Sequence, residues 1–208
     1  NNKLPIIFDV TDETNGSGVN LSTVALKLAG TTYKDGSTGM TKTAITNGYR
    51  FTYTPQAALA DGVKAIEITA SDYDGNAAAK VSASYTVDTV PPTLTLSSPQ
   101  MGLITNQKSC VVNGVTNDAL SSPVTVTITH GSNSYKPSIG SNGAFSQALT
   151  LTEGTNTITV VAKDAAGKTT TITLTVKLDT SVPTIKSAIF APNPVNASAS
   201  VQITLEVE

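Results

Sequence analysis

The sequence contains very few of the side chains that usually build catalytic or metal sites. Cys110 is the only cysteine and His130 the only histidine, so an intrachain disulfide, a thiolate cluster and a two-histidine site are all excluded. Tryptophan is absent, and aromatic residues make up only 5% of the chain. These shortages argue against a zinc enzyme, a disulfide-bonded scaffold and an aromatic platform for sugars.

Charge is scarce as well, at 13% of residues against about 25% in ordinary globular proteins. Thirteen basic and 15 acidic residues leave a formal net charge of −2, which offers no electrostatic footprint for nucleic acid or an anionic membrane. Hydrophobic residues make up 39%, too many for disorder, yet no apolar run approaches the roughly 18 residues of a membrane helix. We predict a folded, soluble chain without a nucleic-acid partner or a membrane span.

Threonine takes the place of charged residues. The sequence has 34 threonines and 20 serines, and in residues 124–129 and 171–176 threonine alternates with valine, isoleucine or leucine. A period of two predicts strands with one buried face. Threonine suits the outer face, because it is β-branched and presents a solvated hydroxyl. Since no convincing helical period extends beyond about ten residues, the fold class is predicted to be all-β.

A repeat of about 90 residues organises the chain. Residues 61–76 align with residues 153–168 at a shift of 92, and one deletion later the segment that starts at Asp88 aligns with the segment that starts at Asp179. Both segments read Asp-Thr, then proline and threonine. The length fits a two-sheet sandwich, and proline belongs at the start or edge of a strand. The repeated motif, Asp-Thr followed by proline and threonine, therefore predicts a joint between modules.

The repeat predicts two complete modules and the beginning of a third. Module one spans residues 1–88, module two residues 89–179, and residues 180–208 are an incomplete start of a third module. The first strand of each module is expected after a proline, namely Pro5, Pro92 and Pro183. The joints are short and lack a Gly/Ser tract, which predicts a stiff connection. The remainder indicates a piece of a longer protein, whose neighbouring domains are the first expected partners.

Module two carries several motifs in a familiar order: Pro91-Pro-Thr93, Asn142-Gly-Ala-Phe145, Glu153 to Val160, Ala162 to Lys168, and Asp179-Thr180. In this it resembles the bacterial immunoglobulin-like (Big-type) domains, although Lys168 stands where those domains usually have asparagine. Module one resembles the same group more loosely, through residues 70–76 and its exit. The resemblance implies tandem immunoglobulin-like antiparallel β-sandwiches with Greek-key connections, in a secreted or cell-surface bacterial protein.

One cluster offers metal-binding chemistry. Asp72, Asp74 and Asn76 alternate in a predicted hairpin, and Ca²⁺ prefers several converging oxygen ligands. Against calcium, Gly75 falls at the fourth position of the motif instead of the sixth, and Ala83 stands where a bidentate glutamate would follow. Asp and Asn are also ordinary turn formers that hydrogen-bond their own backbone. The sequence leaves both interpretations open, and calcium is the only cofactor it suggests.

Further carboxylates could join such a site. Asp9, Asp12 and Glu13 lie in or near the loop after the first strand of the same module. Asp88 could contribute to a joint site, although that arrangement departs from the cadherin pattern of acidic linkers. Most acidic residues lie in hairpins, loops and joints, with no indication of two carboxylates facing each other across a cleft, as glycoside hydrolysis requires. No catalytic residue is predicted.

The single histidine and the single cysteine are assigned structural places. His130 comes directly before a stretch that is typical of a hairpin tip, Gly131 to Ser134, so we expect it to be exposed. Cys110 lies in an early strand of module two, where we expect it to be buried as a small hydrophobic residue. Neither residue has a partner for nucleophilic catalysis.

The sequence favours a non-catalytic structural spacer that displays other domains of a bacterial surface or secreted protein. The alternative is an adhesion or carbohydrate-associated binding module, the accessory domain of a surface adhesin or of a polysaccharide-active enzyme. Its partner would be another protein or a cell-envelope polysaccharide. Exposed aromatics are too scattered to form a sugar-binding surface, which weighs against the carbohydrate form of this alternative.

Overall fold

The computed structural model describes residues 3–185, and these residues form strands and loops without a helix. In this part of the chain there is accordingly no helix long and apolar enough to cross a membrane. The first seven strands are β1 (Ile6–Thr11), β2 (Ala25–Leu28), β3 (Thr31–Lys34), β4 (Met40–Ile45), β5 (Gly48–Tyr53), β6 (Gly62–Thr69) and β7 (Val81–Val87). The other eight are β8 (Thr93–Ser98), β9 (Leu103–Thr105), β10 (Ser109–Asn117), β11 (Thr125–His130), β12 (Asn133–Tyr135), β13 (Ala144–Thr150), β14 (Gly154–Lys163) and β15 (Thr169–Leu178).

These strands build two β-sandwiches with separate hydrophobic cores. In the first sandwich, a sheet of order β1-β5-β4 faces a sheet of order β3-β2-β6-β7, and Phe8, Leu26 and Phe51 lie in the core. In the second, a sheet of order β13-β10-β8 faces one of order β12-β11-β14-β15-β9, around Val112 and Ile158. The all-β sandwich prediction is confirmed.

The second sandwich has the immunoglobulin-like strand order. The chain crosses from one sheet to the other between β10 and β11 and returns at β13, which produces a Greek-key arrangement. β9 pairs in parallel with the end of β15, whereas the other pairs in this sandwich are antiparallel. Thr171, Thr173 and Thr175 of β15 face outward while Leu174, Val176 and Leu178 are buried, as the alternation predicted.

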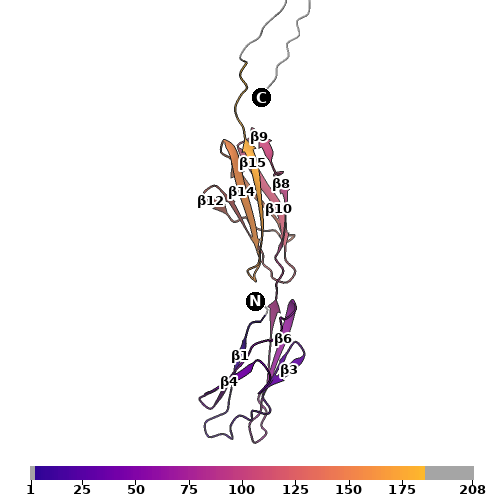
Figure 1. The fold of residues 1–208 in the computed structure, drawn as a ribbon, viewed down its shortest axis with the longest axis vertical. Helices are drawn as coiled ribbons and strands as arrows, with labels where there is room; N and C mark the ends of the chain where they lie inside the picture. Colours follow the sequence, from indigo (N-terminus) through magenta and orange to yellow (C-terminus); the bar gives the residue numbers. More distant parts are fainter. Residues whose placement is uncertain (1–2, 186–208) are drawn as a thin grey trace, which may run out of the picture.

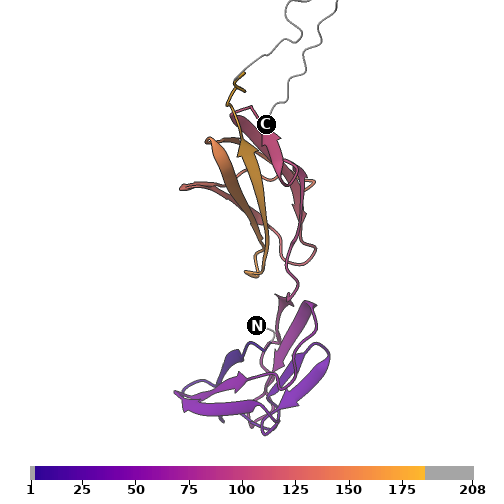
Figure 2. The ribbon, with the colours of Figure 1, turned by 45° about the horizontal axis from the view of Figure 1, so that its top comes forward.

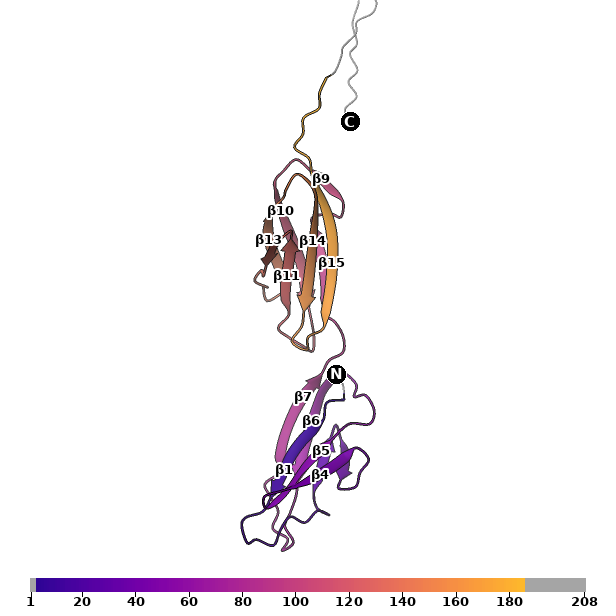
Figure 3. The ribbon, with the colours of Figure 1, turned by 60° about the vertical axis from the view of Figure 1, so that its left-hand side comes forward.

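The two sandwiches follow one another along the long axis of the molecule (Figure 1). The stretch between β7 and β8 is the covalent connection between them, as a second direction of view shows (Figure 2). The end of β7 and the beginning of β6 in the first sandwich lie near the loops that follow β10 and β14 of the second (Figure 3). We call the end of each sandwich that holds the β6–β7 or β14–β15 hairpin its hairpin end. The opposite end, where the chain leaves, is its exit end.

As predicted, the first strand of each described sandwich follows a proline: β1 begins after Pro5 and β8 after Pro92. The two strands do not take the same place in their sandwiches, however. β1 pairs with β5, the strand before the β6–β7 hairpin, just as β10 pairs with β13 before the β14–β15 hairpin. β1 therefore occupies the position of β10, because pairing partners and not local sequence decide a strand's place in a sheet. The strands expected in 180–208 lie outside the described residues, except that 180–185 form none.

Candidate functional site

The hairpin with Asp72, Asp74 and Asn76 is closed by its own hydrogen bonds. Asp72 Oδ1 accepts a bond from the Asn76 backbone N–H (2.7 Å), and Asp72 Oδ2 accepts one from the Asn76 side-chain amide (2.7 Å). The amide bond, more than any other contact, holds the pKa of Asp72 below its usual range. Asp74 is exposed and contributes its backbone N–H to Ser17 Oγ (3.2 Å). Both Asp72 oxygens thus serve the turn, and calcium at these three residues stays a prediction.

Two of the three additional carboxylates come close to this hairpin. Asp12 and Glu13 line a hollow of about 360 Å³ together with Asp72 and Asn76. Asp9 does not line this hollow. Arg50 binds both its oxygens at 2.8 Å, and these bonds hold the pKa of Asp9 below its usual range. The loop after β1 therefore brings acidic groups to the hairpin end of the first sandwich.

The corresponding hairpin of the second sandwich has the same backbone bonds but different side-chain bonds. The N–H of Asp164 donates to the carbonyl of Lys168 at 3.1 Å, as that of Asp72 does to Asn76. Gly75 and Gly167 both have φ near +90° (88° and 86°), a conformation that glycine adopts without strain. Asp164 Oδ1 accepts from the Lys168 backbone N–H (2.8 Å). However, Lys168 has no amide to offer Oδ2, so this buried oxygen has no hydrogen-bond partner.

Asp164 lies next to two other aspartates at the joint. One oxygen from each of Asp88, Asp118 and Asp164 lies within 4.8 Å of one from both others. Asp88 directly follows β7 of the first sandwich, whereas Asp118 and Asp164 directly follow β10 and β14 of the second. Asp88 and Asp164 are 7% and 4% exposed, and Oδ2 of each is buried without a hydrogen-bond partner.

Backbone N–H groups hold the other oxygen of each carboxylate. Asp88 Oδ1 accepts from the N–H of Val90 (3.0 Å), and Asp118 Oδ1 accepts from those of Leu120 (2.8 Å) and Ser121 (2.7 Å). Together with the bond from Lys168 to Asp164, these contacts fix the orientation of all three carboxylates. The cluster is therefore a rigid arrangement and not a chance meeting of flexible side chains.

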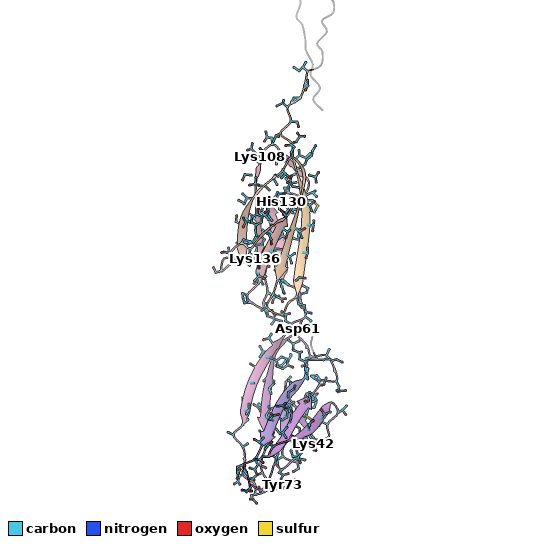
Figure 4. All side chains as sticks on the ribbon, turned by 90° about the vertical axis from the view of Figure 1, so that its left-hand side faces the viewer. Lys42, Asp61, Tyr73, Lys108, His130 and Lys136 are labelled. Atoms are coloured by element: carbon cyan, nitrogen blue, oxygen red, sulfur yellow. The ribbon has the colours of Figure 1, made fainter. Side chains whose placement is uncertain are left out.

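Further bonds position the segments that carry the cluster. Asp61, which Figure 4 shows at the joint, accepts bonds at Oδ1 from the backbone N–H (3.1 Å) and hydroxyl (3.0 Å) of Thr89. The N–H of Ala165 donates to the carbonyl of Ser121 (3.0 Å), which ties the two loops of the second sandwich together. The linker after Asp88 is thus attached to the first sandwich. In the second sandwich, the loops that carry Asp118 and Asp164 are bonded to each other.

The electrostatics of the cluster are unfavourable by themselves. The ion pairs found among the described residues include none of these three carboxylates. Two like unit charges 4.8 Å apart repel by about 3 kcal/mol at an effective dielectric constant of about 20. Burial of oxygens without a partner adds to this unfavourable energy. An arrangement held so firmly in spite of repulsion can attract and coordinate a cation.

Sequence reasoning missed this cluster, although it named Asp88 as a candidate for a joint site and aligned Asp164 with Asp72. Two features of the sequence together indicate the cluster. Asp118 and Asp164 each follow directly after a strand, and Lys168 replaces the asparagine that would satisfy Asp164. Their convergence depends on which strands end at the joint, which the sequence alone does not show.

The prediction for His130 is wrong. His130 is only 7% exposed, because it ends β11 on the face where every second residue is buried. Its Nε2 lies 2.9 Å from Asn156 Oδ1. The Asn156 amide nitrogen donates to the carbonyls of Thr152 (2.8 Å) and Gly154 (3.0 Å), so Oδ1 is the atom that accepts from His130. The period of two in β11 would have revealed this burial, had it been extended to the last residue.

Cys110 lies in the core of the second sandwich, and the hollows lie on its surface. Cys110 is buried in β10, as predicted, and burial raises the pKa of its thiol. Open hollows of about 680 and 780 Å³ lie on the second sandwich, and both include Lys136 and Pro137. Phe145, which is buried in the core, is the single aromatic among the residues that line them.

One family model matches the second sandwich, and one curated protein matches a longer stretch of the chain. Residues 92–180 match the family described as glucodextranase, domain B. The chain is 30% identical over 131 residues to Bacillopeptidase F of Bacillus subtilis (strain 168). That alignment covers 63% of this chain but only 9% of the relative, so the chain spans a small part of that protein's length.

Solved structures with similarity to the chain are distant in sequence. The fibronectin(III)-like modules of Clostridium thermocellum CbhA are 16% identical with a TM-score of 0.42, covering 84% of this chain and 85% of theirs. A chimeric titin Z1Z2 tandem is 10% identical with a TM-score of 0.34, covering 86% of this chain and 92% of its own. The immunoglobulin-like β-sandwich assignment rests on the strand order of the structure itself.

Proposed function

We propose that the chain is a non-catalytic spacer made of two tandem bacterial immunoglobulin-like modules, with boundaries at 1–88 and 89–179. The observation that carries this proposal is the repeated exit. Glu153 binds the backbone N–H (3.1 Å) and hydroxyl (2.8 Å) of Thr180, as Asp61 binds those of Thr89. The aspartate before each threonine also accepts a backbone N–H two residues later, at 3.0 and 3.1 Å. A joint closed twice by the same hydrogen bonds suits a stiff series of modules.

The comparisons support a role without chemistry of its own. The matched family is named for a domain of a glucodextranase, and the curated relative is named a peptidase. A module type found in chains with such different names is expected to serve the display of other domains and not one reaction. We place the chain in a secreted or cell-surface bacterial protein, in keeping with its threonine-covered outer faces and its single, buried cysteine.

The spacer role predicts a fixed distance between the sandwiches. Fluorophores on Lys34→Cys and Lys136→Cys, in a Cys110→Ala background, would report this distance by single-molecule energy transfer in calcium-free buffer. We expect one narrow distribution. A control with Thr89→Gly and Val90→Ser removes the hydroxyl bonds to Asp61 and frees the backbone of the linker, and it should broaden the distribution. Equal breadth in both proteins would contradict the spacer proposal.

A binding role is the second candidate, supported by the hollow of about 680 Å³ on the second sandwich. Hydroxyl groups and two lysines, Lys136 and Lys163, line this hollow, which would suit an acidic or hydroxyl-rich partner. Titration with soluble cell-envelope polysaccharide, with Lys136→Ala as the comparison, would test this role. Saturable binding that the substitution weakens would favour it over a pure spacer.

A further inference from the structure

We propose that Asp88, Asp118 and Asp164 bind one Ca²⁺ ion at the joint between the two sandwiches. Ligands of a single Ca²⁺ lie 2.3–2.6 Å from the ion, so two of them can be at most about 5 Å apart. The observed separations of no more than 4.8 Å meet this limit for all three pairs. The three groups can therefore bind one ion from the positions that they occupy in the structure.

The hydrogen-bond pattern indicates that the oxygens are arranged for a ligand. In each carboxylate one oxygen is held by backbone N–H groups. In Asp88 and Asp164, both more than nine-tenths buried, the second oxygen has no partner in the described structure. A buried acceptor without a donor is destabilising, and a cation supplies the missing interaction. The equivalent oxygen of Asp72 needs no cation, because the Asn76 amide already satisfies it.

The chemistry of the donors favours calcium over other metals. All three side chains are hard oxygen donors, which suit Ca²⁺ and Mg²⁺. Zinc and softer metals prefer nitrogen and sulfur, yet the only histidine and cysteine are buried in the core of the second sandwich. Mg²⁺ demands near-ideal octahedral geometry, whereas Ca²⁺ accepts irregular sets completed by carbonyl groups and water. A site assembled from a linker and two loops fits the more tolerant ion.

The ligands come from both sides of the joint, and this gives binding a mechanical consequence. Asp88 is attached to the first sandwich through β7 and the neighbouring Thr89–Asp61 bonds, whereas the other two ligands belong to the second. One ion would therefore connect the two sandwiches and hold their relative orientation. This goes beyond the spacer role. Whether the joint binds a cation does not depend on how stiff the joint is in the absence of calcium.

Calorimetric titration of the whole chain with CaCl₂, after treatment with a chelator, tests the proposal directly. We expect one site per chain, with a dissociation constant of about 10⁻⁴–10⁻³ M as in other extracellular modules. Melting curves should shift upward with calcium, less with magnesium, and return with chelator. Asp88→Asn, Asp118→Asn and Asp164→Asn should each weaken binding about tenfold or more, because ligand charge sets the affinity.

The matched controls are the repeat counterparts, Asp179→Asn for Asp88 and Asp72→Asn for Asp164. Both should leave calcium binding unchanged. The three joint variants should fold, since asparagine has the size of aspartate and removes repulsion; their calcium-free melting temperatures should equal or exceed that of the unchanged chain. No binding at millimolar calcium would overturn the proposal. Binding lost only in Asp72→Asn would overturn it in favour of the first hairpin.

The spacer proposal and the calcium proposal can fail separately. The energy-transfer experiment in calcium-free buffer tests the stiffness that the hydrogen-bonded exit provides. Repeating it with calcium should narrow the distribution further in the unchanged chain but not in Asp164→Asn. Identical distributions with and without calcium, despite measured binding, would contradict the mechanical consequence derived above.

Discussion

The hairpins Asp72–Asn76 and Asp164–Lys168 share a backbone turn and differ in the fate of one oxygen. In the first, the Asn76 amide binds Asp72 Oδ2 at 2.7 Å, and the turn is complete. In the second, lysine replaces asparagine, and Asp164 Oδ2 stays buried without a partner beside two other carboxylates. A single residue thus decides whether the same turn satisfies its own aspartate or presents it to a cation. The shared backbone geometry of the two turns therefore does not predict which hydrogen bonds their side chains make.

The location of the hairpins adds to this difference. The second hairpin faces the exit of the first sandwich, which supplies Asp88. The first has Asp12 and Glu13 from its own sandwich around a hollow of about 360 Å³. The joint site is thus composite, with ligands from two modules. Substitutions in each sandwich can test whether the two sandwiches unfold independently and how their stabilities differ.

The largest effect should come from emptying one core at a time. Phe51 is fully buried in the first sandwich and stacks on Phe8 with ring centroids 5.2 Å apart. Phe51→Ala should cost about 3–5 kcal/mol and lower only the melting transition of the first sandwich. Phe145→Ala should do the same for the second. Calorimetry in the presence of a chelator measures both transitions; if either variant lowers both equally, the sandwiches are one cooperative unit.

A smaller effect should distinguish the exit ends. Asn156 binds His130 and the loop before β14, whereas its repeat counterpart Lys64 makes one bond, to the Asp61 carbonyl (3.3 Å). Asn156→Ala should destabilise the second sandwich by about 2–3 kcal/mol, because it leaves buried polar groups unpaired. Lys64→Ala should cost about 1 kcal/mol or less. Urea unfolding followed by near-ultraviolet signals measures both, and comparable losses would contradict the assigned importance of Asn156.

Exchanging the two hairpin residues tests whether the residue at position 76 or 168 decides if the turn aspartate is satisfied. Lys168→Asn should provide an amide for Asp164, as Asn76 does for Asp72, and should weaken calcium binding a few-fold. Asn76→Lys removes the amide bond to Asp72 and should destabilise the first sandwich slightly, without effect on calcium at the joint. Calorimetric titration and melting curves measure both outcomes. Unchanged calcium affinity in Lys168→Asn would mean that the lysine is not what frees Asp164.

Acid should lower the stability of the first sandwich more than that of the second. This is the smallest of the effects that we predict. The pKa values of Asp9, Glu67 and Asp72 are held low, chiefly by side-chain hydrogen bonds from Arg50, Lys80 and Asn76 respectively. A carboxyl whose pKa is lower when folded stabilises the protein above its unfolded pKa, and this is lost as the pH falls through the folded value.

The relevant window therefore lies below about pH 4.5, the upper of the ordinary values of these groups. In the part of the chain that the structure describes, the second sandwich has one such carboxyl, Asp179 at its exit. Melting curves between neutral pH and pH 3 should show the first transition falling faster. Arg50→Gln should reduce this difference, since Arg50 is what lowers the pKa of Asp9. Parallel falls of both transitions would contradict the assignment.

Much of the fold could be predicted from local patterns. The alternation of threonine with apolar residues in β11 and β15 marks strands, because successive side chains of a strand point to opposite faces. The repeat predicted two complete modules, and the burial of Cys110 followed from its place in a strand. Proline followed by an apolar run located the start of β1 but not its partner strand, since strand pairing depends on residues far away in the chain.

The sequence by itself determined the class of fold, the repeat and the turn residues at each hairpin, since these depend on side-chain period and on residues close together in the chain. Only the tertiary structure decided that Asp88, Asp118 and Asp164 meet. They are separated by tens of residues and converge because β7, β10 and β14 all end at the joint. Charge and hydrogen-bond capacity are written in the sequence, but their sum at one point in space depends on how the strands are packed.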